Sequence, residues 1–263
     1  MNATDFASLG SGSLVGFVLG LIGGGGSILA VPLLVYVVGV AQPHIAIGTS
    51  AVAVSLSAFA NLIGHARAGH VRWPCALVFS AAGMAGAALG SALGKRFDGQ
   101  MLLLLFGVLM LAIALAMLLR KAAGAESFQP LSRATAGRLL PRLIAMGGAV
   151  GALSGFFGIG GGFLIVPGLM GAARLPMIMA VGSSLVAVTA FGATTAASYA
   201  LSGLVDWRIA ALFVGGGLAG GVAGTILAKR LATRKALLTQ VFAGIVALVG
   251  AYVVARGAWS LWG

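Results

Sequence analysis

Acidic side chains are scarce in this sequence of 263 residues, which has four Asp and Glu against 16 Lys and Arg. Charged residues make up 8% of the chain and hydrophobic residues 60%, whereas about 25% of the residues of a soluble domain are charged. Such a chain cannot cover its surface with polar groups, so we expect it to lie in a lipid bilayer. The Lys and Arg residues occupy short gaps between apolar runs, where they indicate topology and contacts with lipid headgroups rather than binding of nucleic acid.

Cysteine is also scarce, and the motifs of several enzyme classes are missing. The single Cys75 excludes an intrachain disulfide and a cysteine-based metal cluster. The glycine-rich stretches have no lysine at the place that a Walker loop requires, and the chain contains neither HExxH nor GxSxG. We therefore expect no cofactor, no metal and no enzymatic activity, although an intramembrane enzyme stays open as the least favoured alternative.

Long apolar runs without charged residues divide into eight segments. Most have about the 20 residues that a helix needs to cross the hydrocarbon core. Segments 6–40 and 143–173 are too long for one crossing and too short for two, and each contains a glycine cluster followed by proline. Each is expected to be a broken or re-entrant helix. The fold class predicted is an all-α, polytopic membrane protein.

The two long segments begin two similar halves of the chain. Pro32 and Pro167 correspond at an offset of 135, and after a shift of one residue 48–50 (Gly-Thr-Ser) corresponds to 182–184 (Gly-Ser-Ser). An internal duplication is therefore predicted, with a first transmembrane repeat at 1–120, a basic connector at 121–142 and a second transmembrane repeat at 143–263. In the first repeat, the ridge formed by Gly12, Gly16 and Gly20 is expected to be a helix contact face.

The distribution of basic residues favours one topology. If each broken segment enters and leaves on the same side, 12 of the 16 Lys and Arg residues lie on one side of the membrane. The positive-inside rule then places the connector in the cytoplasm and both termini outside it, with the two repeats inverted. A parallel arrangement, in which all eight segments cross, stays open.

Backbone groups at the two breaks and hydroxyls at helix starts are the candidate substrate ligands, because both can donate to an anion without a buried charge. The alternative is that these residues have structural roles: the glycines only permit tight turns, and the hydroxyls bond back to the preceding helix turn. The substrate-binding candidates are Gly23, Gly24, Gly25, Gly26, Ser27, Thr49, Ser50, Gly158, Gly160, Gly161, Gly162, Ser183 and Ser184. Candidates for a polar lining are Asn61, His65, Thr195 and Tyr199.

Carboxylates are missing from the middle of every apolar segment. Asp5, Asp98, Glu126 and Asp206 all fall in loops or at segment edges. Carriers of cations and protons usually place Asp or Glu within the membrane. The sequence therefore favours a small anion as the substrate.

The sequence contains the duplicated break followed by proline and two helix starts with hydroxyl side chains, and the spacing of Gly69 and Trp73 recurs at Gly203 and Trp207. With these features the whole chain resembles the sulfite exporter TauE/SafE family. This resemblance implies a multi-pass permease of the bacterial inner membrane that exports sulfite, sulfoacetate or a similar organosulfur anion.

The function expected is that of a secondary carrier that binds a small anion between the two broken segments, where the repeats meet. Its partners would be this anion and membrane lipid, and a homo-oligomer stays open. An anion channel or a transporter of another small solute are the alternatives.

Overall fold

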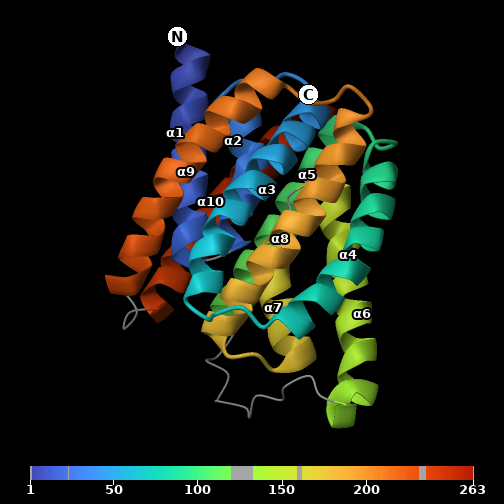
Figure 1. Cartoon of the computed structure of the whole chain (residues 1–263). Helices are drawn as coiled ribbons and strands as arrows, with labels where there is room; N and C mark the ends of the chain where they lie inside the picture. The colour runs from blue at the N-terminus through green and yellow to red at the C-terminus, as the bar shows by residue number, and fades with distance from the viewer. Residues whose placement is uncertain (1, 23, 120–132, 159–161, 231–234, 263) are drawn as a thin grey trace.

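The structure, a computed structural model, describes residues 2–22, 24–119, 133–158, 162–230 and 235–262. All regular elements in these ranges are helices (Figure 1), and seven of them are long and apolar enough to cross a membrane. The expected all-α, polytopic class is thereby confirmed. In chain order the elements are α1 (Ala3–Ile22), the 3-10 helix η1 (Gly24–Leu29), α2 (Ala30–Tyr36), α3 (Pro43–Arg67), α4 (Trp73–Gly94), α5 (Gly99–Leu119), α6 (Arg133–Phe157), α7 (Gly162–Ala173), α8 (Met177–Ala200), α9 (Trp207–Arg230) and α10 (Lys235–Trp262).

The helices form one bundle, and helices that the sequence offset pairs, such as α3 and α8, run in opposite directions (Figure 1). The start of α1 and the end of α10 lie at the same end of the bundle, which we call the termini end; α5 ends and α6 begins at the opposite end. From the termini end α1, α3, α5 and α9 run toward the opposite end, whereas α4, α6, α8 and α10 run back.

Both long apolar segments are broken helices, as the glycine clusters predicted. The first segment crosses the bundle as α1, turns through η1 and returns toward the termini end as α2 (Figure 1). In the second segment α6 ends at Phe157, and α7 turns back from Gly162 toward the opposite end. Of the residues described at the breaks, Gly25, Gly26, Ser27 and Gly158 are buried, and their backbone groups must find protein partners rather than lipid.

Helix α6 begins inside the region expected to be the connector. Its first residue is Arg133 rather than a residue near 143. Leu139 and Leu143, four positions apart on one helix face, are both buried, and this burial extends the helix beyond the charge-free segment. The remainder of the connector, with Glu126, lies outside the described residues.

Glycine ridges hold helices of different halves in close contact. On α1 the ridge faces α9, and on α6 an equivalent ridge faces α4; a Cβ atom at any of these glycines would overlap the backbone of the facing helix. Small residues allow this approach of two backbones, which is a main source of helix association in membranes. The expected contact face on α1 is thus confirmed. The facing pairs are Gly12–Phe213, Gly16–Gly217 and Gly20–Gly221 for α1 and α9, and Gly147–Phe79, Gly151–Gly83 and Gly155–Ala87 for α6 and α4.

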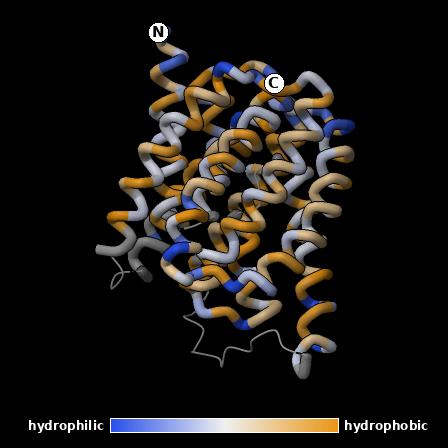
Figure 2. Tube along the Cα trace, in the orientation of Figure 1, coloured by the Kyte–Doolittle hydropathy of each residue, from blue (hydrophilic) through white to orange (hydrophobic). Residues whose placement is uncertain are grey.

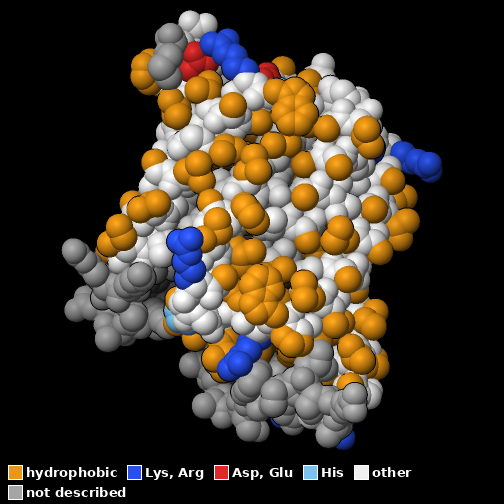
Figure 3. All heavy atoms as spheres, viewed as in Figure 1, with side chains coloured by type: hydrophobic (Ala, Val, Ile, Leu, Met, Phe, Trp, Pro, Cys, Tyr) orange, Lys and Arg blue, Asp and Glu red, His pale blue; other side chains and the backbone are white. Residues whose placement is uncertain are grey.

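The outer surface of the bundle is apolar. Hydrophobic side chains are spread over the face shown in Figure 3, with few Lys and Arg among them. Hydrophobic residues also follow the helices along their length (Figure 2). Leu89, Val222 and Leu248 are each more than half exposed. In water an apolar surface of this extent would cause association, so these side chains are suited to the hydrocarbon core of a bilayer.

Candidate functional site

The first break is buried between α1 of its own half and α7 of the other half. Gly25, Gly26 and Ser27 lie in η1 and are buried. A Cβ atom on Gly26 would lie 2.5 Å from the backbone nitrogen of Leu19 and 2.8 Å from the carbonyl oxygen of Val15. Glycine at this position therefore lets the returning chain pass close to α1, which is a structural role. Gly24 also lies in η1, whereas Gly23 lies outside the described residues.

The second break contacts the first turns of α3. Ser50 is fully buried, and its Oγ donates to the carbonyl oxygen of Ile47 at 2.8 Å and lies 3.3 Å from that of Gly158. Gly158 has φ +67°, and a Cβ atom there would overlap the Ile47 side chain. The structure thus brings together two predicted site residues, Ser50 and Gly158, from different halves. We call this contact the Ser50–Gly158 junction.

The other predicted glycines of the second cluster are less informative. Gly162 is the first residue of α7. Gly160 and Gly161 lie outside the described residues.

The hydroxyls of Thr49 and Ser183 each hold a loop of the other half. The backbone N–H of Asp206 donates to Thr49 Oγ1 at 3.0 Å, and that of Arg72 donates to Ser183 Oγ at 2.9 Å. Both hydroxyl residues are fully buried, so each bond satisfies a loop N–H that would otherwise lack a partner. Ser184 donates to the carbonyl oxygen of Val181 at 2.8 Å within its own helix.

The two hydroxyl pairs do not form one cluster. Thr49 and Ser50 lie about 10 Å from the start of α3, and Ser183 and Ser184 about 10 Å from the start of α8, at 1.5 Å rise per residue. Helix α3 starts at the termini end and α8 at the opposite end (Figure 1). One pair therefore lies toward each end of the bundle.

Of the predicted polar lining, the two residues on α3 have different surroundings. Asn61 joins α3 to α9: its Nδ2 donates to the carbonyl oxygen of Ser57 at 3.0 Å, and Thr225 Oγ1 donates to its Oδ1 at 3.3 Å. His65 is half-buried, and its ring centroid lies 5.6 Å from that of His70. Asn61 thus contributes to helix packing.

The two residues on α8 are fully buried. Thr195 and Tyr199 lie one turn apart, and neither side-chain hydroxyl has a hydrogen-bond partner among the described residues. Buried polar groups in proteins are nearly always bonded. These two hydroxyls are therefore available to a water molecule or a substrate.

A pocket at the termini end was missed by sequence reasoning. Its volume is about 460 Å³, and it lies where the loops before α3, between α4 and α5, and before α9 converge. The polar sequence around Pro43 was the only signal of it, because the other lining residues come from distant loops. The lining residues are Gln42, Pro43, His44, Lys95, Asp98, Gly99, Gln100 and Leu204. We call this cavity the Lys95 pocket.

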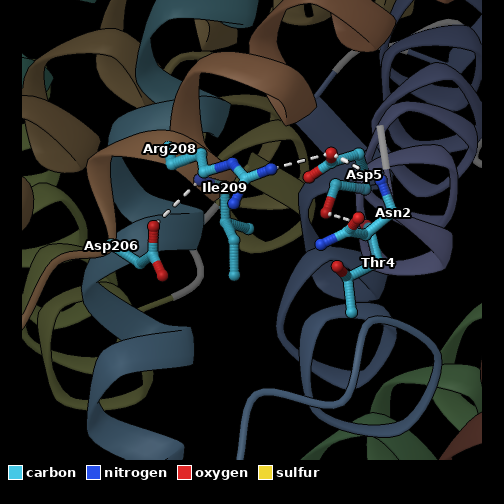
Figure 4. Close-up of polar contacts among 7 residues, drawn as sticks. Asn2, Thr4, Asp5, Asp206, Arg208 and Ile209 are labelled. Carbon is cyan, nitrogen blue, oxygen red and sulfur yellow. Dashed lines mark hydrogen bonds and ion pairs between the residues drawn. The ribbon is translucent and has the colours of Figure 1, made fainter.

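The carboxylates of the described residues stabilise helix starts. Asp98 Oδ2 accepts from the backbone N–H groups of Gln100 and Met101 at 2.9 and 3.0 Å. Asp206 Oδ1 accepts from the backbone N–H of Ile209 at 3.0 Å (Figure 4). An aspartate in this position caps the helix and complements its dipole.

Asp5 combines such a cap with an ion pair. Its Oδ2 accepts from the backbone N–H of Asn2 at 2.9 Å and from Arg208 Nη2 at 2.8 Å, which ties α1 to α9 (Figure 4). The carboxylates among the described residues therefore lie in or just before the first turn of a helix. As the sequence indicated, they are not in the middle of a span.

Fold and site together define the class of protein. Seven apolar spans with buried breaks make this a multi-pass membrane protein. The model of the family described as "Sulfite exporter TauE/SafE" matches residues 8–253, so the chain belongs to this family. Among the described residues, no group of three or more His, Cys, Asp and Glu could hold a metal ion.

Curated relatives extend over nearly the whole chain. It is 54% identical over 255 residues to a protein of Xylella fastidiosa strain 9a5c named "Probable membrane transporter protein", covering 97% of this chain and 95% of that one. It is 27% identical over 271 residues to "Probable membrane transporter protein YunE" of Bacillus subtilis, covering 95% and 97%. No solved structure matches the chain. The protein is therefore a membrane transporter of the TauE/SafE family.

Proposed function

We propose that this transporter is a secondary carrier, and not an enzyme, that exports sulfite or an organosulfonate across the bacterial inner membrane. The observation that carries the proposal is the family match, because the family is described as a sulfite exporter and the match extends over residues 8–253. The substrate sign has independent physical support. The carboxylates of the described residues are used at helix starts, so they leave no acid in the middle of these spans to attract a cation.

The proposed architecture is a pair of inverted repeats. Its support is that corresponding helices run in opposite directions (Figure 1) and that the glycine contacts of α1 with α9 recur between α6 and α4. The hydrogen bond from Asp206 to Thr49 also recurs, as the bond from Arg72 to Ser183 at an offset of 134. With the positive-inside rule, this arrangement puts the opposite end in the cytoplasm and the termini end outside it.

The Ser50–Gly158 junction is the proposed contact with the substrate. The Ser50 hydroxyl has one hydrogen and two acceptors, and the 3.3 Å distance to Gly158 is long for a hydroxyl donor. An anionic oxygen is a stronger acceptor than a neutral carbonyl. An anion at the break would therefore take the Ser50 hydrogen from the carbonyl oxygen of Ile47 and displace the carbonyl of Gly158. Binding of the anion would in this way be coupled to the contact between the two halves.

The test is flux in liposomes that contain the purified protein. Sulfite, sulfoacetate, sulfate, thiosulfate and acetate are compared, with empty liposomes as the blank. A carrier gives counterflow, in which substrate on one side drives uptake of labelled substrate from the other, whereas a channel does not. If none of these anions moves and a divalent cation or a neutral solute does, the proposal is wrong.

A serine pair tests the role of the junction. Ser50→Ala is expected to lower flux by about ten- to a hundredfold, since a hydrogen bond to a charged group contributes about 1.5 to 3 kcal/mol. Ser91→Ala is the matched control, because Ser91 is also fully buried and bonds back within its own helix, to the carbonyl oxygen of Ala88 at 3.0 Å. Equal flux of the two variants would show that Ser50 does not contact the substrate, and it would not contradict the proposed carrier function.

A further inference from the structure

The Lys95 pocket is a cavity with an excess of hydrogen-bond donors. Lys95, His44 and the amides of Gln42 and Gln100 line it, together with one acid, Asp98. The volume of about 460 Å³ is within the range of about 300 to 1,000 Å³ that is usual for small-molecule sites.

The acid in the pocket is already bonded. Asp98 Oδ2 accepts from two backbone N–H groups in the first turn of α5. The Lys95 ammonium, by contrast, donates to the neutral oxygens of Ser198 (carbonyl, 3.0 Å) and Ser202 (hydroxyl, 2.9 Å). An ammonium has three donors, so one is left for a ligand, and the positive charge in the pocket is not cancelled by these partners.

The start of α3 adds further positive potential. The helix begins at Pro43, and its N-cap residue Gln42 makes no side-chain capping bond. Pro43 has no N–H, and the N–H groups of Ile45 and Ala46 donate to the carbonyl oxygen of Gln42. The N–H of His44 and the helix dipole are therefore what this turn offers to an anion. His44 lies in this turn, and its Nε2 is buried without a hydrogen-bond partner among the described residues.

A second polar group without a partner lies beside His44 and Lys95. The centroid of the Tyr199 ring lies 6.4 Å from the centroid of the His44 ring and 5.8 Å from Lys95 Nζ. Tyr199 is fully buried, and its hydroxyl is unbonded among the described residues. Two buried polar groups next to a cavity lined by the Lys95 ammonium point to a ligand that supplies their bonds.

We infer that the Lys95 pocket is an anion-binding site that takes a small oxyanion, a sulfonate or a carboxylate, through Lys95 and the first turn of α3. The inference rests on the proposed function, in which the pocket is the place where the anion enters or leaves at the termini end. The Lys95 pocket differs from the Ser50–Gly158 junction in its residues, and one of its proposed ligands, Lys95, is charged.

The experiment uses cysteine modification, because the natural Cys75 is buried. Gln42→Cys places a thiol in the pocket at an exposed position. The rates of its reaction with a sulfonate-bearing and with a trimethylammonium-bearing methanethiosulfonate are measured in detergent. Sulfoacetate is expected to slow the reaction saturably, and potassium chloride of the same ionic strength is expected not to.

Charge variants decide whether Lys95 is responsible. In the Gln42→Cys background, Lys95→Gln is expected to lower the ratio of anionic to cationic reagent rates about three- to tenfold, the effect of one charge several ångströms away in water. Lys95→Arg keeps the charge and should keep the protection by sulfoacetate. Arg96→Gln is the matched control, since Arg96 is adjacent but does not line the pocket, and its ratio should stay within about twofold.

Two results would overturn the inference. One is an equal ratio of anionic to cationic reagent rates in Lys95→Gln and Arg96→Gln. The other is that neither sulfoacetate nor acetate protects the introduced thiol from modification. The liposome assay separates this outcome from a failure of the proposed function. Flux without protection refutes the pocket alone. Protection without flux of any anion refutes the carrier and leaves the binding site standing.

Discussion

Glycine at the crossing of α6 and α4 should be far more sensitive to substitution than glycine one turn away. A Cβ atom on Gly151 would lie 2.6 Å from the carbonyl carbon of Gly83 and closer still to its oxygen. The only heavy atom near a Cβ on Gly148 is the carbonyl oxygen of Ala82, at 4.0 Å. Gly151→Ala must therefore push the two helices apart by about 1 Å to reach ordinary contact distances, whereas Gly148→Ala requires no movement.

The size of the effect follows from these distances. Overpacking by one methyl group costs about 1 to 3 kcal/mol, and a protein of about 250 residues loses about 2 to 4 °C in Tm per kcal/mol. Gly151→Ala is expected to lower the Tm by about 2 to 12 °C. Gly148→Ala should leave the Tm unchanged or raise it slightly, because alanine is favoured over glycine in a helix by about 0.5 to 1 kcal/mol.

The natural cysteine provides the assay. Cys75 is 2% exposed, so a thiol-reactive dye should label it when the purified protein unfolds on heating. A second pair on α1 checks the result: Gly16 faces the backbone of Gly217, and Gly10 has no heavy atom within 4 Å of a Cβ. If Gly151→Ala and Gly16→Ala melt at the same temperatures as Gly148→Ala and Gly10→Ala, close backbone contact does not stabilise this bundle and the packing argument is wrong.

Two further substitutions test the breaks and the loop contacts. Gly158→Ala should lower the Tm more than Gly151→Ala, because it adds positive-φ strain to overlap with Ile47; an unchanged Tm in the same dye assay would contradict this. Thr49→Val removes the acceptor of the Asp206 N–H and should cost about 1 to 3 kcal/mol, whereas Thr49→Ser should be nearly neutral in the same assay; equal losses would show that the hydroxyl is not what holds this loop.

Local patterns were sufficient to predict the broken helices and the contact ridge of α1. Glycine clusters, proline and the spacing of four residues express these features directly in the sequence. The start of α6 was missed because a charge-free run was used as the measure of a helix, whereas buried Leu139 and Leu143 continue the helix past Arg138 and Arg142.

The site was less accessible to sequence reasoning because its contacts join distant residues. The hydroxyl of Ser183 was identified as a candidate, but its partner is the backbone of Arg72 in the other half. The Lys95 pocket combines three loops, and no local pattern connects Gln42 with Leu204. Long-range pairing of this kind is set by helix packing, which spacing along the chain does not specify.

The termini end, where the Lys95 pocket lies, also differs from the opposite end in the side chains it presents. At the offset of 134, Gln42 and His44 correspond to Pro176 and Ile178, which cannot supply comparable side-chain donors. For the carrier proposed above, this difference cannot set the direction of net transport, which the substrate and ion gradients determine, but it can set the affinity at each end. Lys95→Gln should therefore raise the half-saturating sulfoacetate concentration about tenfold for substrate added at the termini end, and leave it within about twofold for substrate added at the opposite end. An equal rise at both ends would mean that Lys95 acts on the whole carrier rather than on a local site.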